Sequence, residues 1–104
     1  MTNEQFNIEV EKSFLRSKQL LIKKGKEYSG NFDRLEQFHR AGSAQNIPPT
    51  QALIGMVAKH FTSLADMAKE PLDYPKAQWR EKITDIRNYT FLLDALLTDL
   101  GIDK

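Results

Sequence analysis

The segment from Lys76 to Leu100 constrains the fold most, because it lacks proline and glycine and repeats its larger side chains at spacings of three and four. Residues at these spacings share one face of an α-helix. The repeating positions are Trp79, Ile83, Ile86, Thr90, Leu93, Leu97 and Leu100. They predict a long helix that packs against a neighbouring helix and stops at Gly101.

Three further helices are expected before this one, and almost no segment alternates like a half-buried strand. We place them at about residues 3–25, 31–42 and 48–70, with the first fraying near Lys23-Lys24-Gly25. Asn31 can cap the second, and Pro48-Pro49 suits the first turn of the third, where a missing N–H costs no helical hydrogen bond. The expected fold is all-α, a four-helix, antiparallel, bundle-like single domain over residues 1–104.

Charge and composition exclude several classes of partner. Fifteen Lys and Arg against 14 Asp and Glu leave a net charge of +1, so we expect neither long nucleic acid nor an anionic membrane as partner. The chain has no cysteine, which excludes disulfides and thiol nucleophiles and suits a reducing compartment. Without a signal-peptide pattern or a membrane-spanning apolar run, the protein is expected to be cytoplasmic.

Two carboxylates and a carboxamide repeat at helical spacing within the last helix, at Glu81, Asp85 and Asn88. Positions i, i+4 and i+7 share one stripe, so these side chains point the same way. Such a stripe can hold a metal ion, or it can be an ordinary solvated face. Because the line continues to Leu92 and Leu96, it favours a position facing a second helix or a subunit, with a polar pocket at its acidic half.

His60 interrupts the apolar stripe of the third helix. The other members of that stripe are Leu53, Val57, Leu64 and Met67. A histidine in this position is more often a core residue bonded to a carboxylate or carbonyl than a ligand or catalyst. If the third and fourth helices are antiparallel, His60 can approach Asp85 and Asn88, and an imidazolium there would offer a phosphate a donor. The neighbouring Lys59 points elsewhere, as a solvated lysine would.

Lysines gather at the end of the first helix, at Lys23, Lys24 and Lys26, with Tyr28 close by. Lysine beside an aromatic ring can hold a phosphate and stack a base. Lysines that merely stabilise a helix C-terminus give the same pattern, and this interpretation is favoured. No Walker A loop, dinucleotide-binding glycine motif, zinc-protease motif or serine elbow is present, which excludes the enzymes built on them.

Three blocks carry a resemblance to a known family. They are Lys26-Glu27-Tyr28-Ser29-Gly30-Asn31-Phe32, then Pro49 leading to Ala58-Lys59-His60 with Ser63-Leu64, then the run from Glu81 to Tyr89. In this order and spacing the chain resembles small phage-encoded proteins related to the MazG-like, all-α nucleotide pyrophosphohydrolases. The likeness covers about residues 24–97, and no single motif in it is highly specific.

The resemblance implies a helical bundle completed by oligomerisation and a nucleotide as ligand. In active members, carboxylates on two facing helices hold Mg²⁺, which activates water against a nucleoside triphosphate to release pyrophosphate. Glu81 and Asp85 match the acidic positions and are the expected metal-binding and catalytic residues, followed by Asn88 and Tyr89 as ligand contacts. The remaining expected ligand contacts are Lys26, Tyr28, Lys59 and His60.

The third helix departs from the family pattern, because Lys59, His60 and Ser63 stand where active members place a pair of glutamates. Two carboxylates can still hold Mg²⁺ when phosphates supply further oxygens. Two hypotheses therefore stay open: a Mg²⁺-dependent pyrophosphohydrolase, or a protein that sequesters a nucleotide signal, such as a cyclic dinucleotide, without turnover. A helical adaptor for a protein partner is a third. A phage origin would place the protein in the host cytoplasm.

Overall fold

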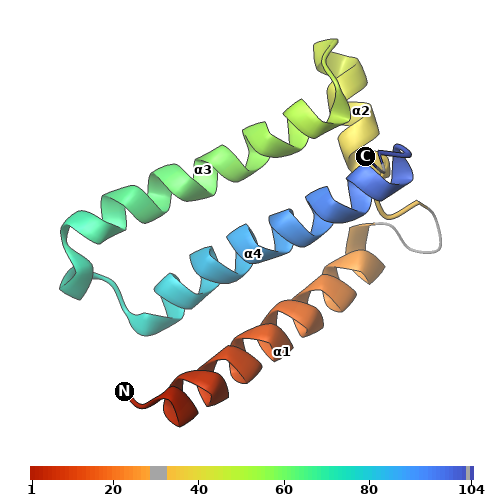
Figure 1. The fold of residues 1–104 in the computed structure, drawn as a ribbon. Helices are drawn as coiled ribbons and strands as arrows, with labels where there is room; N and C mark the ends of the chain where they lie inside the picture. The colour runs from red at the N-terminus through yellow and green to blue at the C-terminus, as the bar shows by residue number, and fades with distance from the viewer. Residues whose placement is uncertain (29–32, 103) are drawn as a thin grey trace.

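The computed structural model describes residues 1–28, 33–102 and 104, and these residues form an all-helical fold (Figure 1). The elements are α1 (Asn3–Tyr28), α2 (Glu36–Gln45), α3 (Pro49–Lys69), the 3-10 turn η1 (Pro71–Asp73) and α4 (Lys76–Asp99). No strand occurs within the described ranges. The predicted all-α class is confirmed, and α4 covers nearly the whole segment predicted for the last helix. None of these helices is long and apolar enough to cross a bilayer.

The long helix α4 lies between α3 and α1, while the short α2 crosses one end of the molecule and packs against α3 (Figure 1). α3 and α4 are antiparallel, as their short connection predicts. α1 instead runs in the same direction as α4 (Figure 1). The reason is the length of α2: its 10 residues do not carry the chain back along the bundle, so α3 starts at the end where α1 stops. The expected antiparallel order therefore holds for only one of the two pairs.

The apolar core sits at the end of the molecule where α2 crosses. It consists of the buried residues Leu35, Phe38, Leu53 and Leu96, against which Met56, Tyr89, Leu92 and Leu93 pack. The side chains of Phe38 and Leu96 are fully buried. This core joins α2, α3 and α4 and leaves α1 out.

The inward face of α4 differs from the predicted seam. Ile83 and Leu100 of that seam are exposed, and the residues of α4 that are buried are Thr84, Asn88 and Leu96. Because α4 has a helix on each of two sides, a single stripe cannot describe its contacts. The second line, through Asn88 and Leu96, is the one that faces the neighbouring helices, as its turn from polar to apolar indicated.

The contact between α1 and α4 is more polar than the core. The buried polar residues in the described part of the chain are Ser17, Thr84 and Asn88, and all three belong to these two helices. α1 carries large apolar side chains that are about half exposed: Phe6, Ile8, Phe14, Leu15 and Ile22. One of them, Phe14, lies beside α4, with its ring centroid 6.5 Å from that of Phe91. Packing against α4 therefore leaves much of the apolar surface of α1 exposed.

The size of the molecule reflects this open arrangement. Its radius of gyration is 15.8 Å, whereas a compact domain of this length has one of about 13 Å. Its accessible surface is 7762 Å², whereas a monomeric protein of this mass exposes about 6,000 Å². Much apolar surface is thus left uncovered within one chain.

The C-terminal ends of α1 and α2 were predicted wrongly, and in both cases a glycine was taken for a terminator; α2 also begins only at Glu36 and not directly after Asn31. α1 continues through Gly25 to Tyr28, and a Cβ at residue 25 would lie 3.1 Å from Nε of Arg34, whose side chain crosses the helix there. α2 continues through Gly42, where a Cβ would lie 2.7 Å from the carbonyl oxygen of Ile47. Both glycines make room for a close neighbour.

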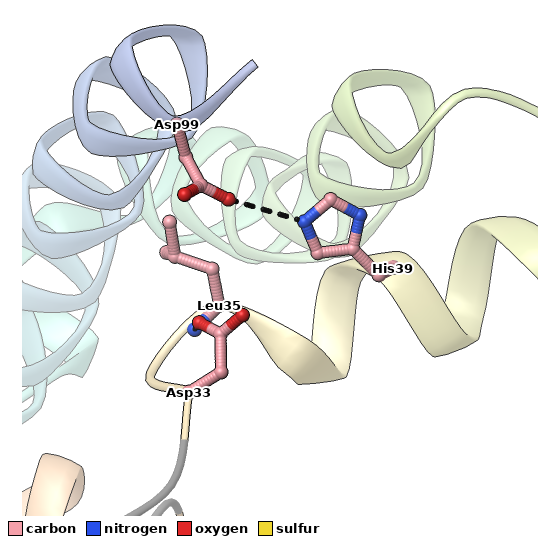
Figure 2. Close-up of polar contacts among 4 residues, drawn as sticks. All are labelled: Asp33, Leu35, His39 and Asp99. Atoms are coloured by element: carbon pink, nitrogen blue, oxygen red, sulfur yellow. Dashed lines mark hydrogen bonds and ion pairs between the residues drawn. The ribbon is translucent and has the colours of Figure 1, made fainter.

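Figure 2 shows how the start of α2 is fixed and how this helix meets the end of α4. The backbone N–H of Leu35 donates to Oδ1 of Asp33 over 2.9 Å, and Nε2 of His39 lies 3.4 Å from Oδ2 of Asp99. The cap that was predicted, Asn31, lies outside the described residues. The first contact is local to residues 33–35, and the second joins α2 to the end of α4.

Candidate functional site

A cleft of about 260 Å³ opens where α1, α4 and the start of α2 meet. We call it the Asp85 cleft. Its polar lining is Lys24 from α1, Arg34 and Gln37 from around the start of α2, and Asp85, Asn88 and Tyr89 from α4. Leu21 and Leu92 complete the wall. Three residues that the sequence singled out on the last helix therefore share one cleft.

The structure does not bring the other expected residues into this cleft. Glu81 is exposed one turn before Asp85 and is not part of the lining. Lys26 and Lys59 are also exposed and do not line it. The side chain of Tyr28 lies outside the described residues. The stripe through Glu81, Asp85 and Asn88 is thus split, with its first member in solvent and its last member buried.

His60 approaches the cleft from α3, as predicted for antiparallel helices. Its Nδ1 lies 3.7 Å from Oδ2 of Asp85, and its ring centroid lies 5.4 Å from that of Tyr89. The N···O separation exceeds hydrogen-bond length. The contact is an ion pair only when the imidazole is protonated. Nδ1 is buried and has no hydrogen-bond partner among the described residues. His60 therefore stands beside Asp85 and Tyr89, although it does not line the cleft itself.

Arg34 is the functional candidate that sequence reasoning missed, and Lys24 was passed over in favour of Lys26. Arg34 reaches the cleft because its side chain lies against the backbone of α1 at Gly25. A lone arginine between two helices carries no periodic signal, and this position depends on a contact between separate segments of the chain. The signal that was available is Gly25 itself, since a glycine inside a helix often marks a close approach.

Two polar atoms at the cleft lack a partner among the described residues. They are Nη1 of Arg34, a donor, and Oδ1 of Asn88, an acceptor, and both are buried. Buried polar atoms are almost always hydrogen-bonded in folded proteins, because an unmet donor or acceptor costs about 1–3 kcal/mol. A ligand or an ordered water that met these atoms would remove this cost.

The donor set of the Asp85 cleft fits an anion better than Mg²⁺. Lys24 and Arg34 bring two positive charges, Asp85 brings one negative charge, and neither cation forms an ion pair with a described residue. Mg²⁺ prefers several oxygen ligands. No group of three or more His, Cys, Asp or Glu side chains within residues 1–28 and 33–102 is placed to hold a metal ion. The lining as it stands presents charge for binding a phosphate directly.

No family model, no curated protein and no solved structure matches the chain. The resemblance carried by the three sequence blocks stays a prediction. What the geometry gives is a small polar cleft with a net positive lining, a buried amide and one aromatic ring. These groups are available to a ligand in the cleft.

Proposed function

We propose that the Asp85 cleft binds the phosphate group of a nucleotide directly, without a metal ion between protein and phosphate. The observation that carries this proposal is the convergence of Lys24 and Arg34, two cations without a carboxylate partner among the described residues, on one cleft. Guanidinium groups bind phosphate through paired N–H donors, and a lysine adds a point charge. The choice of a nucleotide over other phosphorylated ligands rests on the resemblance to the MazG-like proteins.

Each lining residue has a role in this proposal. The Nη1 donor of Arg34 and the ammonium of Lys24 bind phosphate oxygens, while the amide of Asn88 contributes Oδ1 as an acceptor to a ligand hydroxyl or amino group. Tyr89 offers a ring beside which a base can stack. The cleft volume of about 260 Å³ is below the usual range of about 300–1,000 Å³ for ligand pockets. It holds the phosphate end, and the rest of the nucleotide lies outside.

Substitution of Asp85 distinguishes direct binding of the phosphate from binding through Mg²⁺. Without a metal ion its carboxylate repels a phosphate in the same cleft, so Asp85→Asn should strengthen binding. A charge pair about 4 Å apart is worth about 1 kcal/mol in water and more in a cleft, which corresponds to at least about a fivefold gain in affinity. If Mg²⁺ bridges the carboxylate and the phosphate, the same substitution should weaken binding.

The test is calorimetric titration of the purified protein with nucleoside triphosphates and cyclic dinucleotides, each with and without Mg²⁺. Glu81→Gln is the matched control, because it removes the same charge one turn away at a position outside the cleft. We expect tighter binding for Asp85→Asn and no change for Glu81→Gln. Loss of binding in Asp85→Asn would refute direct binding. Pyrophosphate release that requires Mg²⁺ and Asp85 would instead establish the hydrolase, which is favoured only by the presence of this carboxylate in the cleft.

A second pair of variants tests the location. Lys24→Met removes a cation that lines the cleft, while Lys23→Met removes the preceding lysine, which is exposed and outside the lining. We expect Lys24→Met and Arg34→Met each to lower nucleotide affinity about tenfold, in line with hydrogen bonds to charged groups. Equal losses for Lys23→Met and Lys24→Met would show that binding depends on general charge and not on this cleft.

A further inference from the structure

A second and larger cleft, of about 510 Å³, lies between the N-terminal halves of α1 and α4. Arg16 from α1 and Arg87 from α4 line it together, with Lys76, Arg80 and Trp79 from the first turns of α4. We call it the Arg16–Arg87 cleft. None of the residues of the Asp85 cleft takes part in its lining.

The two arginines have few partners of their own. Nη2 of Arg16 donates to the hydroxyl of Ser13 over 3.0 Å, and Nη2 of Arg87 donates to the hydroxyl of Thr84 over 3.3 Å. The Nε atoms of both arginines are buried without a hydrogen-bond partner among the described residues. Neither guanidinium forms an ion pair within the described part of the chain. Each guanidinium therefore has unused N–H donors and, among the described residues, no carboxylate that neutralises its charge.

The remaining charges around the cleft do not neutralise the pair. Glu9 is the acid in the lining, and its carboxylate lies 3.7 Å from the ammonium of Lys12. Burial and then the positive charge of Arg16 lower the pKa of Arg87, as expected for two like charges that line the same cleft. Lys76 and Arg80 add two more cations. The first turn of α4 adds the positive end of its helix dipole.

We propose that the Arg16–Arg87 cleft is a second binding site, for a phosphorylated ligand whose oxyanion lies between the two guanidinium groups. An oxyanion there would relieve the repulsion between the arginines and accept hydrogen bonds from their free donors. The indole of Trp79 forms part of the wall and is held by its Nε1, which donates to the carbonyl oxygen of Pro71 over 3.3 Å. It also packs edge-on against Tyr74, with ring centroids 6.5 Å apart.

Trp79 provides the assay, because it is the single tryptophan of the chain. The full-length protein is titrated with inorganic pyrophosphate at low ionic strength, and the indole fluorescence is followed. The same titration is repeated on Arg16→Met and Arg87→Met, with Arg40→Met as the matched control, since Arg40 is exposed and pairs only with Glu36 in the described structure. Circular dichroism confirms that each variant is folded.

We expect saturable pyrophosphate binding by the wild-type protein, with an affinity that falls at least about tenfold in Arg16→Met and in Arg87→Met and stays unchanged in Arg40→Met. Arg87→Lys, which keeps the charge but loses the fork, should bind more weakly than wild type. An unchanged affinity in either methionine variant, or no saturation at millimolar pyrophosphate, would overturn the proposal. Lys24→Met serves as a further control: it should leave this fluorescence response intact, so that failure of this site and failure of the Asp85 cleft can be told apart.

Discussion

Three glycines of the described ranges lie inside helices, and the same substitution should have three different effects on them. Alanine is about 1 kcal/mol more favourable than glycine in a helix interior. At Gly55 in α3 a Cβ would meet no atom within 4 Å. Gly55→Ala should therefore realise the whole gain and raise the melting temperature by about 4–8 °C.

At Gly42 the gain is outweighed by a clash with backbone. A Cβ there would lie 2.7 Å from the carbonyl oxygen of Ile47 and 3.1 Å from the backbone nitrogen of Pro49. These atoms cannot move without shifting the turn that connects α2 to α3. Overpacking of this kind costs about 1–3 kcal/mol, so Gly42→Ala should destabilise the protein by about 1 kcal/mol after the helix gain is subtracted.

At Gly25 the same substitution should change stability and nucleotide binding in opposite directions. The nearest atom to a Cβ is Nε of Arg34, at 3.1 Å, which belongs to a long side chain that can move aside. Gly25→Ala should therefore keep most of the gain in stability while moving Arg34 out of the Asp85 cleft and lowering nucleotide affinity. Urea unfolding followed by circular dichroism, together with calorimetric titration, measures both quantities. Stabilisation by Gly42→Ala as large as that by Gly55→Ala would contradict the expected backbone clash. Nucleotide binding by Gly25→Ala equal to that of the wild type would contradict the expected movement of Arg34.

Further predictions concern the surface, the arginine pair and the start of α2. If the chain assembles through the half-exposed apolar side chains of α1, Phe14→Glu should lower the mass measured by size-exclusion chromatography with light scattering, because it places a charge among them; identical masses would contradict an assembly through these side chains. Arg87→Met should raise the melting temperature, since burial and the charge of Arg16 lower the pKa of Arg87, so that its charge is less favourable in the folded protein than in the unfolded chain; a lower melting temperature would contradict this expectation. Asp33→Ala should cost about 1 kcal/mol in urea unfolding, because Leu35 N–H loses its acceptor, whereas Asp33→Asn should cost less.

The sequence predicted where most of the helices lie, but not which residues of different helices contact one another. Periodicity placed α3 and α4 well, because each has an apolar stripe uninterrupted by proline. The turn of the Glu81 line into Leu92 and Leu96 correctly indicated that part of it is buried. The short connection between α3 and α4 indicated an antiparallel pair, which correctly placed His60 near Asp85. All of these depend on local spacing and on one antiparallel pair.

The cleft residues contributed by other segments could not be predicted in this way. Arg34 enters the site because its side chain crosses α1 at Gly25, and Arg16 meets Arg87 because α1 lies parallel to α4. Each contact joins residues that do not share a helix, so no helical period records it. The direction of α1 depends in turn on how short α2 is; a short second helix was predicted, but the expected antiparallel order did not take its length into account.

The placement of the core at one end has a consequence for how the chain opens in solution. Leu35, Phe38, Leu53 and Leu96 tie α2 to the first half of α3 and the last half of α4, whereas the first half of α1 has no share in this cluster. Local opening costs least where few apolar contacts must be broken. Amide protons in the first three turns of α1 should therefore exchange with solvent far sooner than those around Leu53 and Leu96. The Arg16–Arg87 cleft is built partly on this readily opened half, so an occupying anion would be seen as slowed exchange along α1.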